Sequence, residues 1–165
     1  MNNIVLIGMP SSGKSTVGVI VAKHLGMSFV DTDVLLQTQN NRRLQDIINT
    51  DGIDKFLEIE ENTVLSLNLC NTVIATGGSA VYSEKAMKHL KANAIVVYLN
   101  INMKTVKRRL RNIKTRGVVL SPGQTLEEIY QKRKPLYEKY ADIIIDSSEN
   151  SIDETVEAII EKLDF

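Results

Sequence analysis

The chain has 165 residues, of which 43% are hydrophobic, so it can bury one substantial core but is short for two. Its 20 basic and 20 acidic residues give a formal net charge of zero, which argues against a nucleic-acid or membrane-surface partner. No apolar run approaches the ~20 residues of a membrane span and no secretory signal opens the chain, so we expect a cytoplasmic, monomeric, single-domain protein over residues 1–165.

Five short apolar runs are predicted to be the strands of the fold. In chain order they are Ile4–Gly8, Ser28–Val30, Thr72–Thr76, Ala94–Leu99 and Asp142–Asp146. Their nearly continuous hydrophobicity is typical of strands that helices cover on both faces. Because helix-like segments alternate with them, the sequence predicts an α/β fold: a three-layer α/β/α arrangement around a five-stranded, mainly parallel sheet.

Helical spacing of apolar residues marks several of the segments between these strands. The apolar residues of 17–25 recur at that spacing before a glycine, and those of 152–163 do so near the C-terminus. Residues 126–140 are predicted to form a further helix. Between residues 112 and 125, two glycines and one proline interrupt the periodicity, which predicts a mobile excursion and not a domain boundary.

The first strand leads directly into GMPSSGKST, Gly8–Thr16, which matches the phosphate-binding pattern G-x-x-x-x-G-K-[ST] in full. The glycines let backbone N–H groups face phosphate oxygens, and the next helix presents its positive end to the same anion. Lys14 can reach the terminal phosphates, and the Ser15 hydroxyl can ligate Mg²⁺. An ordinary glycine-rich turn is the alternative, but the position between a strand and an amphipathic helix favours ATP binding. The expected ATP contacts in this loop are Ser11, Ser12, Gly13, Lys14, Ser15 and Thr16.

Two carboxylates follow the second strand in VDTDV, at the sheet edge where ligands collect in α/β folds. If the segment is extended, Asp31 and Asp33 point to the same side and Thr32 points away. One acid is then expected to act through Mg²⁺, and the other to bind a substrate hydroxyl and accept its proton. The alternative is that one of them caps the following helix.

Two local features give no functional site. Lys104–Arg116 holds seven basic residues in thirteen positions, but it lacks interleaved aromatic residues, so a solvated helix face followed by a loop is favoured over nucleic-acid binding. The single cysteine, Cys70, has no partner for a disulfide and lies in a mostly apolar run, so we expect it to be buried.

The chain resembles the shikimate kinases, small P-loop enzymes similar to nucleoside monophosphate kinases. The resemblance rests on five motifs that occur in that family's order and approximate spacing. They are GMPSSGKST, VDTDV, ATGGSAV (75–81), KTRGVVL (114–120) and KRKPLYEKYAD (132–142). It implies transfer of the γ-phosphoryl group of ATP to the 3-hydroxyl of shikimate, giving 3-phosphoshikimate and ADP, with Mg²⁺ as the cofactor.

The same resemblance assigns roles to individual polar residues. Asp31 would hold Mg²⁺ together with Ser15, and Asp33 would bind the acceptor hydroxyls and serve as the candidate base. Arg133 would grip the carboxylate of the acceptor, a task suited to a planar two-pronged donor. For Arg133 the alternative is an ordinary surface arginine on a helix.

A lid over the triphosphate is a further implication of the resemblance. Arg116 would belong to this lid, at about residues 112–125, and would stabilise charge with Lys14 as the phosphoryl group moves. Arg109, seven residues earlier and so on about the same helix face, would lie against the adenine.

The acceptor pocket is where the sequence departs from the family pattern. Gly77 and Gly78 match it and would let the acceptor approach the backbone, but Ser79 replaces a third glycine. Leu57 stands where the family places a second carboxylate-binding arginine, close to Glu60. A third departure, in the lid, puts Gly117 where the family has a proline.

These departures keep other functions open from the sequence alone. A kinase of the same fold that acts on homoserine, a sugar acid or a polyol is the nearest alternative, and a non-catalytic ATP-binding module is the next. A nucleotide kinase is disfavoured because Asp33 and Arg133 together suit a hydroxylated acid.

Overall fold

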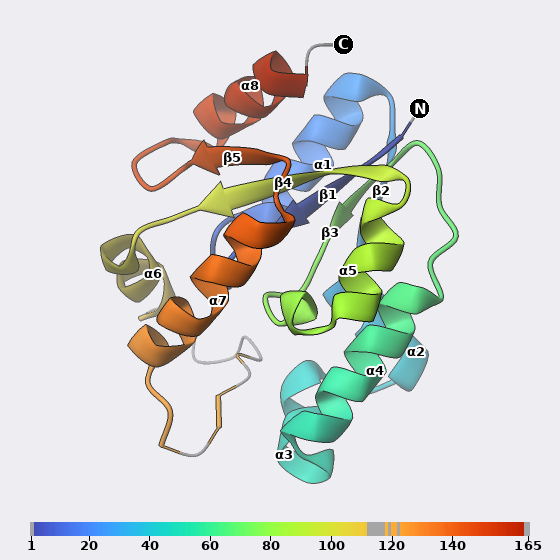
Figure 1. Cartoon of the computed structure of the whole chain (residues 1–165), viewed down its shortest axis with the longest axis vertical. Coiled ribbons are helices and arrows are strands. Elements are labelled where there is room, and N and C mark those ends of the chain that lie inside the picture. The colour runs from blue at the N-terminus through green and yellow to red at the C-terminus, as the bar shows by residue number, and fades with distance from the viewer. Residues whose placement is uncertain (1, 112–117, 119, 122, 164–165) are drawn as a thin grey trace.

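The computed structural model describes residues 2–111, 118, 120–121 and 123–163. Its strands form one parallel sheet in the order β2-β3-β1-β4-β5, which confirms the α/β fold predicted from the sequence (Figure 1). The strands are β1 (Asn3–Ile7), β2 (Ser28–Asp31), β3 (Thr72–Ala75), β4 (Ala94–Asn100) and β5 (Ile143–Asp146). The helices are α1 (Lys14–Leu25), α2 (Thr32–Asn40), α3 (Leu44–Asp51), α4 (Ile53–Leu65), the 3₁₀ helix η1 (Ala80–Tyr82), α5 (Glu84–Lys91), α6 (Met103–Leu110), α7 (Leu126–Tyr140) and α8 (Ile152–Leu163).

Helices cover both faces of the sheet, because successive residues of its central strands point to opposite faces and nearly all of them are apolar. Ile4 and Leu6 of β1 pack with residues of α1 and α8, whereas Val5 and Ile7 pack with residues of α5, α6 and α7. Figure 1 shows α1 and α8 on one side of the sheet and α5 and α7 on the other. β1 lies in the middle of the sheet and is buried along its whole length. The loop that follows β1 is therefore attached to the most firmly held strand.

A small satellite core supports the helices on the β2 side of the molecule. Its buried members are Leu36 of α2, Ile47 and Ile48 of α3, and Phe56 of α4. Leu57 is partly buried and packs against this cluster. The satellite core thus fixes the face of α4 that carries Leu57 and Glu60.

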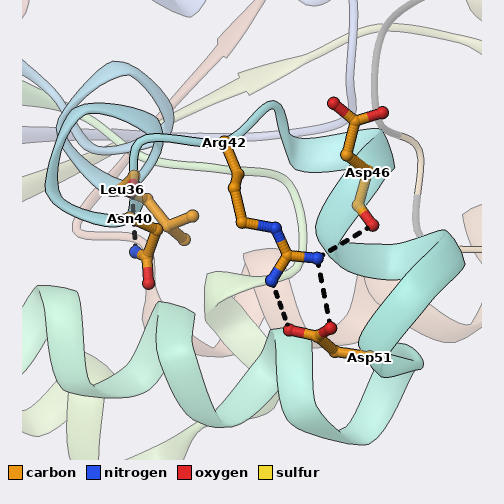
Figure 2. A network of polar contacts seen from close by, with 5 residues as sticks. All are labelled: Leu36, Asn40, Arg42, Asp46 and Asp51. Atoms are coloured by element: carbon orange, nitrogen blue, oxygen red, sulfur yellow. Dashed lines mark hydrogen bonds and ion pairs between the residues drawn. The ribbon is translucent and has the colours of Figure 1, made fainter.

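The turn between α2 and α3 is closed by a polar network (Figure 2). The Arg42 guanidinium donates to both carboxylate oxygens of Asp51, at 2.7 and 3.1 Å, and to the backbone oxygen of Asp46 at 3.3 Å. At the end of α2, the Asn40 side chain donates to the backbone oxygen of Leu36 at 2.8 Å. Because Arg42 precedes α3 and Asp51 ends it, the network ties this short helix to its own entry loop.

Cys70 is the residue whose predicted environment was wrong. It is exposed, in the segment that connects α4 to β3. The apolar letters around it do not form one buried face, since Leu65 at the end of α4 is exposed as well. None of the helices in the described part of the chain is long and apolar enough to span a membrane.

Candidate active site

The phosphate-binding loop between β1 and α1 is wrapped around Lys14. Gly13 adopts a φ of 90°, which favours glycine, and from this position it begins α1. The Lys14 ammonium group donates to the backbone oxygens of Gly8 and Met9, both at 2.8 Å, and to the Ser12 hydroxyl at 3.2 Å. The side chain is only 8% exposed. The loop therefore holds a positive charge at the N-terminus of a helix, where an anionic phosphate is stabilised.

Asp31 both caps a helix and contacts the loop, so the two roles considered for it are compatible. Its Oδ1 atom accepts from the backbone N–H groups of Asp33 at 2.9 Å and Val34 at 3.2 Å, which caps α2. Its Oδ2 atom accepts from the Ser15 hydroxyl at 2.5 Å. The predicted extended geometry was wrong, because Asp33 lies in the first turn of α2. Thr32 is buried and accepts from the Gly77 N–H at 3.1 Å, so it joins two sheet-edge segments.

The Ser15–Asp31 pair fits a Mg²⁺ ion. A hydroxyl and a carboxylate in contact are hard oxygen donors, and Mg²⁺ commonly takes one or two such protein ligands while phosphate oxygens and water complete its octahedron. Ser15 is exposed at the start of α1, beside the end that favours phosphate. Within the described residues, the buried Ser11 hydroxyl of the same loop has no hydrogen-bond partner.

The turn after β3 brings two carboxylates together. A Cβ atom added at Gly77 would lie 2.5 Å from Oε2 of Glu60 and 2.6 Å from Oδ1 of Asp33, so no side chain fits there. Asp33 comes from α2 and Glu60 from α4, and the two acids meet at this glycine. Absence of a side chain at Gly77 thus leaves room for both carboxylates at the carboxyl edge of the sheet.

Arg133 is buried next to Gly78, the following glycine of the same turn. It is 1% exposed, which excludes the surface-arginine alternative. Its Nε–H donates to the hydroxyl of Tyr82 at 3.1 Å, and a Cβ atom added at Gly78 would come within 2.9 Å of its Nη1 atom. Tyr137 donates to the Gly78 oxygen at 2.6 Å, and burial raises the pKa of this tyrosine, so it stays protonated as a donor.

Glu60 is a buried carboxylate that the sequence motifs did not single out as a site residue. It is 3% exposed, and its Oε1 atom accepts from the Ser79 hydroxyl at 2.6 Å. The pKa of Glu60 is raised to about 7: burial is the largest cause and the nearby Asp33 adds to it, while the Ser79 hydrogen bond and Arg133 act in the opposite direction. The signal was present in the sequence: Glu60 falls on the helical stripe of α4 that is otherwise formed by Phe56, Thr63 and Val64.

Leu57, which the sequence predicts in the acceptor site, lines a pocket of the structure. The pocket has a volume of about 220 Å³ and lies between α4, η1 and the start of α5. Its walls include Leu57 and Glu60 of α4, and Ser79 and Tyr82 of the turn after β3. Leu57 therefore touches both this pocket and the satellite core.

Arg109 reaches the phosphate-binding loop from α6. Its Nη1 atom donates to the backbone oxygen of Ser11 at 2.9 Å, and burial lowers the pKa of the guanidinium. The helix ends at Leu110, and the expected relation between Arg109 and Arg116 stays a prediction. Arg116 and Gly117 lie outside the described residues, as does most of the expected lid.

Fold and site together define a class of protein. The site has a phosphate-binding loop after the central strand, a carboxylate in contact with its serine, and an acid pair at the glycine next to the one that a buried arginine borders. These features define a P-loop kinase for a small acceptor. The chain belongs to the shikimate kinase family, since the family model described as "Shikimate kinase" matches residues 10–164.

Individual relatives agree with this membership. The chain is 37% identical over 165 residues to a shikimate kinase of Thermodesulfovibrio yellowstonii, with 98% of this chain and 95% of that protein covered. It is 33% identical over 167 residues to a shikimate kinase of Thiobacillus denitrificans, covering 99% and 91%. It superposes on the shikimate kinase from Acinetobacter baumannii in complex with shikimate with a TM-score of 0.90 at 27% identity, covering 99% and 93%. The family expected from the sequence is confirmed, and with it the assignment as a small-molecule kinase.

Proposed function

We propose that the chain transfers the γ-phosphoryl group of ATP to the 3-hydroxyl of shikimate. The observation that carries this proposal is that, in a member of this family, Asp33 borders Gly77 and the buried Arg133 borders the neighbouring Gly78. A carboxylate that accepts from a hydroxyl and an arginine that donates to a carboxylate suit a hydroxylated acid. The similar kinase from Acinetobacter baumannii has been solved in complex with shikimate, which is such an acid.

Binding and positioning of the triphosphate fall to the loop. Its backbone N–H groups and Lys14 hold the phosphates, and Arg109 supports the loop at Ser11 and lies where it can border the nucleotide. Ser15 and Asp31 would hold Mg²⁺, which neutralises charge on the β- and γ-phosphates when bound. We assign Arg116 to the same task from the lid side.

Phosphoryl transfer then needs one proton to move. The acceptor hydroxyl oxygen forms a bond to the γ-phosphorus as the bond from that phosphorus to the β,γ-bridging oxygen breaks, and ADP leaves. Asp33 takes the proton of the attacking hydroxyl and returns it to solvent. Catalysis rests on alignment and charge neutralisation, with Arg133 holding the far end of the acceptor. The expectation of a cytoplasmic monomer that binds neither nucleic acid nor membrane belongs to the same proposal.

A coupled ADP-release assay with Mg·ATP tests the proposal over shikimate, homoserine, gluconate and several polyols. We expect clear turnover of shikimate and little of the others. Lys14→Met should lower kcat by about a hundredfold or more, and Lys23→Met, an exposed lysine on the same helix, should not. Turnover of another alcohol without turnover of shikimate would reject the acceptor and keep the kinase. Inactivity with every acceptor would favour a non-catalytic ATP-binding module.

A further inference from the structure

Ser79 and Glu60 form a buried pair next to the proposed acceptor site. Ser79 is 4% exposed and its hydroxyl donates to Oε1 of Glu60 at 2.6 Å. The other carboxylate oxygen, Oε2, is buried and has no hydrogen-bond partner among the residues that the structure describes. A buried carboxylate oxygen without a donor is costly, so it indicates a group that is satisfied by a ligand.

The position of this oxygen indicates which ligand. Oε2 of Glu60 and Oδ1 of Asp33 both lie against the bare Cα of Gly77, so the two carboxylates are neighbours at one end of the acceptor site. Asp33 is the proposed partner of the reacting hydroxyl. A second hydroxyl on the adjacent carbon of the acceptor is the group that a second carboxylate at this place can accept from.

Ser79 fixes the orientation of Glu60. Its hydroxyl is the donor that the structure shows on this carboxylate, and it comes from the turn that also contains Gly77 and Gly78. Leu57, one turn before Glu60 on α4, lines the same pocket but has no polar atom to offer. Orientation of Glu60 is therefore coupled to the acceptor turn through a residue at which the chain departs from the family pattern.

We propose that Ser79 is a positioning residue for acceptor specificity: it holds Glu60 so that Oε2 accepts a hydrogen bond from a second acceptor hydroxyl, beside the hydroxyl bound by Asp33. This inference rests on the proposed function, because it needs a polyhydroxylated acceptor in this site. An acceptor without that hydroxyl leaves the buried carboxylate unsatisfied, which is a strong basis for rejection.

The pH at which Glu60 loses its proton distinguishes a positioning role for Ser79 from a purely structural one, because only a positioning role would change that pH. The groups around its carboxyl are Asp33 of α2, Arg133 and Tyr137 of α7, and the Ser79 hydroxyl. Burial is the main cause that raises the pKa of Glu60 to about 7, a value that already includes the opposing effect of the Ser79 bond, which favours the ionised form. Acceptor affinity should therefore rise with pH through neutrality. Removing the Ser79 hydroxyl should move this rise to higher pH.

The test compares the wild-type enzyme with Ser79→Ala and Ser79→Gly, using shikimate and each of its single-deoxy analogues over a range of pH. Wild type should discriminate strongly against one analogue. Both variants should raise KM for shikimate about tenfold with a much smaller change in kcat, lose most of that discrimination, and shift the rising limb of kcat/KM to higher pH. An unchanged KM, pH profile and discrimination in both variants would overturn the inference.

Ser83→Ala is the matched control. The Ser83 hydroxyl donates to Oε2 of Glu61 at 2.5 Å and borders the same pocket, but Glu61 is only partly buried and does not lie at Gly77. This variant also removes the cap of α5, so it reports a loss of local stability alone. It should leave the deoxy-analogue discrimination and the pH profile unchanged.

A measurement without substrate separates failure of this inference from failure of the proposed function. Infrared difference titration of the ligand-free protein follows the carboxyl band of Glu60, with Glu60→Gln identifying it. Ser79→Ala should raise the midpoint of this titration. If the alanine variant does not fold, Ser79→Gly is used in its place. An unmoved midpoint overturns the role of Ser79 whichever acceptor the enzyme uses. A raised midpoint in a protein that does not phosphorylate shikimate supports the pair and rejects only the acceptor.

Discussion

We expect Leu57 to set how strongly the pocket holds an acidic acceptor. It stands within the pocket wall, three residues before Glu60, and offers no charge. Leu57→Arg should place a guanidinium beside Glu60 and add a second donor for the acceptor carboxylate. A hydrogen bond to a charged group contributes about 1.5 to 3 kcal/mol, so KM for shikimate should fall by roughly tenfold to over a hundredfold.

Steady-state kinetics with shikimate check this prediction, with Leu65→Arg as the control. Leu65 is exposed at the end of the same helix and does not border the pocket, so its replacement should leave KM unchanged. An unchanged or higher KM in Leu57→Arg would mean that this position does not face the acceptor.

Gly77 has no room for a side chain, and this makes a second prediction at the residue scale. In Gly77→Ala the added Cβ would lie 2.5 Å from Oε2 of Glu60 and 2.6 Å from Oδ1 of Asp33, so both carboxylates must move. We expect kcat/KM for the acceptor to fall by about a hundredfold or more. Binding of an ATP analogue, measured by calorimetry, should be retained because the loop around Lys14 is not touched. Loss of nucleotide binding as well would show that the substitution damages the fold.

Individual residues also show where prediction from the sequence ends. Lys14 and the Ser15–Asp31 contact follow from local motifs, since a strand, a glycine-rich loop and a helix bring these groups to one edge. Asp33 was expected on an extended segment. The Asp31 carboxylate instead caps α2, so the helix starts at Thr32 and includes Asp33. The Ser79–Glu60 pair joins two segments 19 residues apart, so only the packing of α4 against the turn after β3 reveals it.

At the scale of elements, α4 carries one wall of the pocket, and α3 packs against α4 in the satellite core. Arg42 in turn ties α3 to its own entry loop. The Arg42–Asp51 ion pair closes the loop around α3 (Figure 2), and the guanidinium holds the pKa of Asp51 below its usual value. Asp51→Asn should therefore speed amide exchange across residues 44–51. It should also raise KM for the acceptor while kcat stays within about twofold, because the phosphate loop belongs to other elements.

Hydrogen exchange read out by mass spectrometry, together with steady-state kinetics, tests this support. Lys55→Ala is the control, since it removes an ion pair with Glu58 on the exposed face of α4. It should change neither quantity. Protection of α3 that survives in Asp51→Asn would show that the satellite core alone holds this helix.

The strands were predictable as elements because each is a short apolar run. β1, which is the central strand, is buried completely. Helix α7 was predicted with the bounds that the structure shows, although Pro135 lies inside it. Cys70 was misplaced for a physical reason: apolar content within a run does not tell which side of the molecule the connecting segment crosses. Elements are fixed by local periodicity, whereas exposure depends on what packs above them.

Stability of the whole molecule should depend on pH through Glu60. Its pKa is about 7 in the folded protein and 4.5 in its ordinary state, so between these values the folded chain keeps a proton that the unfolded chain releases. This contribution to stability is complete below pH 4.5 and is lost as the pH rises through 7. Above that pH, a desolvated carboxylate lowers the free energy of unfolding by up to about 3 kcal/mol.

Glu60→Gln removes the titration and keeps an oxygen that can accept from Ser79. In urea unfolding over a range of pH, the free energy of unfolding of the variant should rise relative to that of wild type as the pH rises. The difference should reach a plateau of at most about 3 kcal/mol. Asp51→Asn should behave in the opposite way, because the lowered pKa of Asp51 stabilises the fold only where that carboxyl is ionised. The loss of unfolding free energy in Asp51→Asn, relative to wild type, should disappear as the pH falls through the lowered pKa of Asp51. A constant difference between Glu60→Gln and wild type at every pH would mean that the pKa of Glu60 is the same in the folded and the unfolded chain, so that a cation or a donor other than Ser79 offsets the burial of the carboxylate.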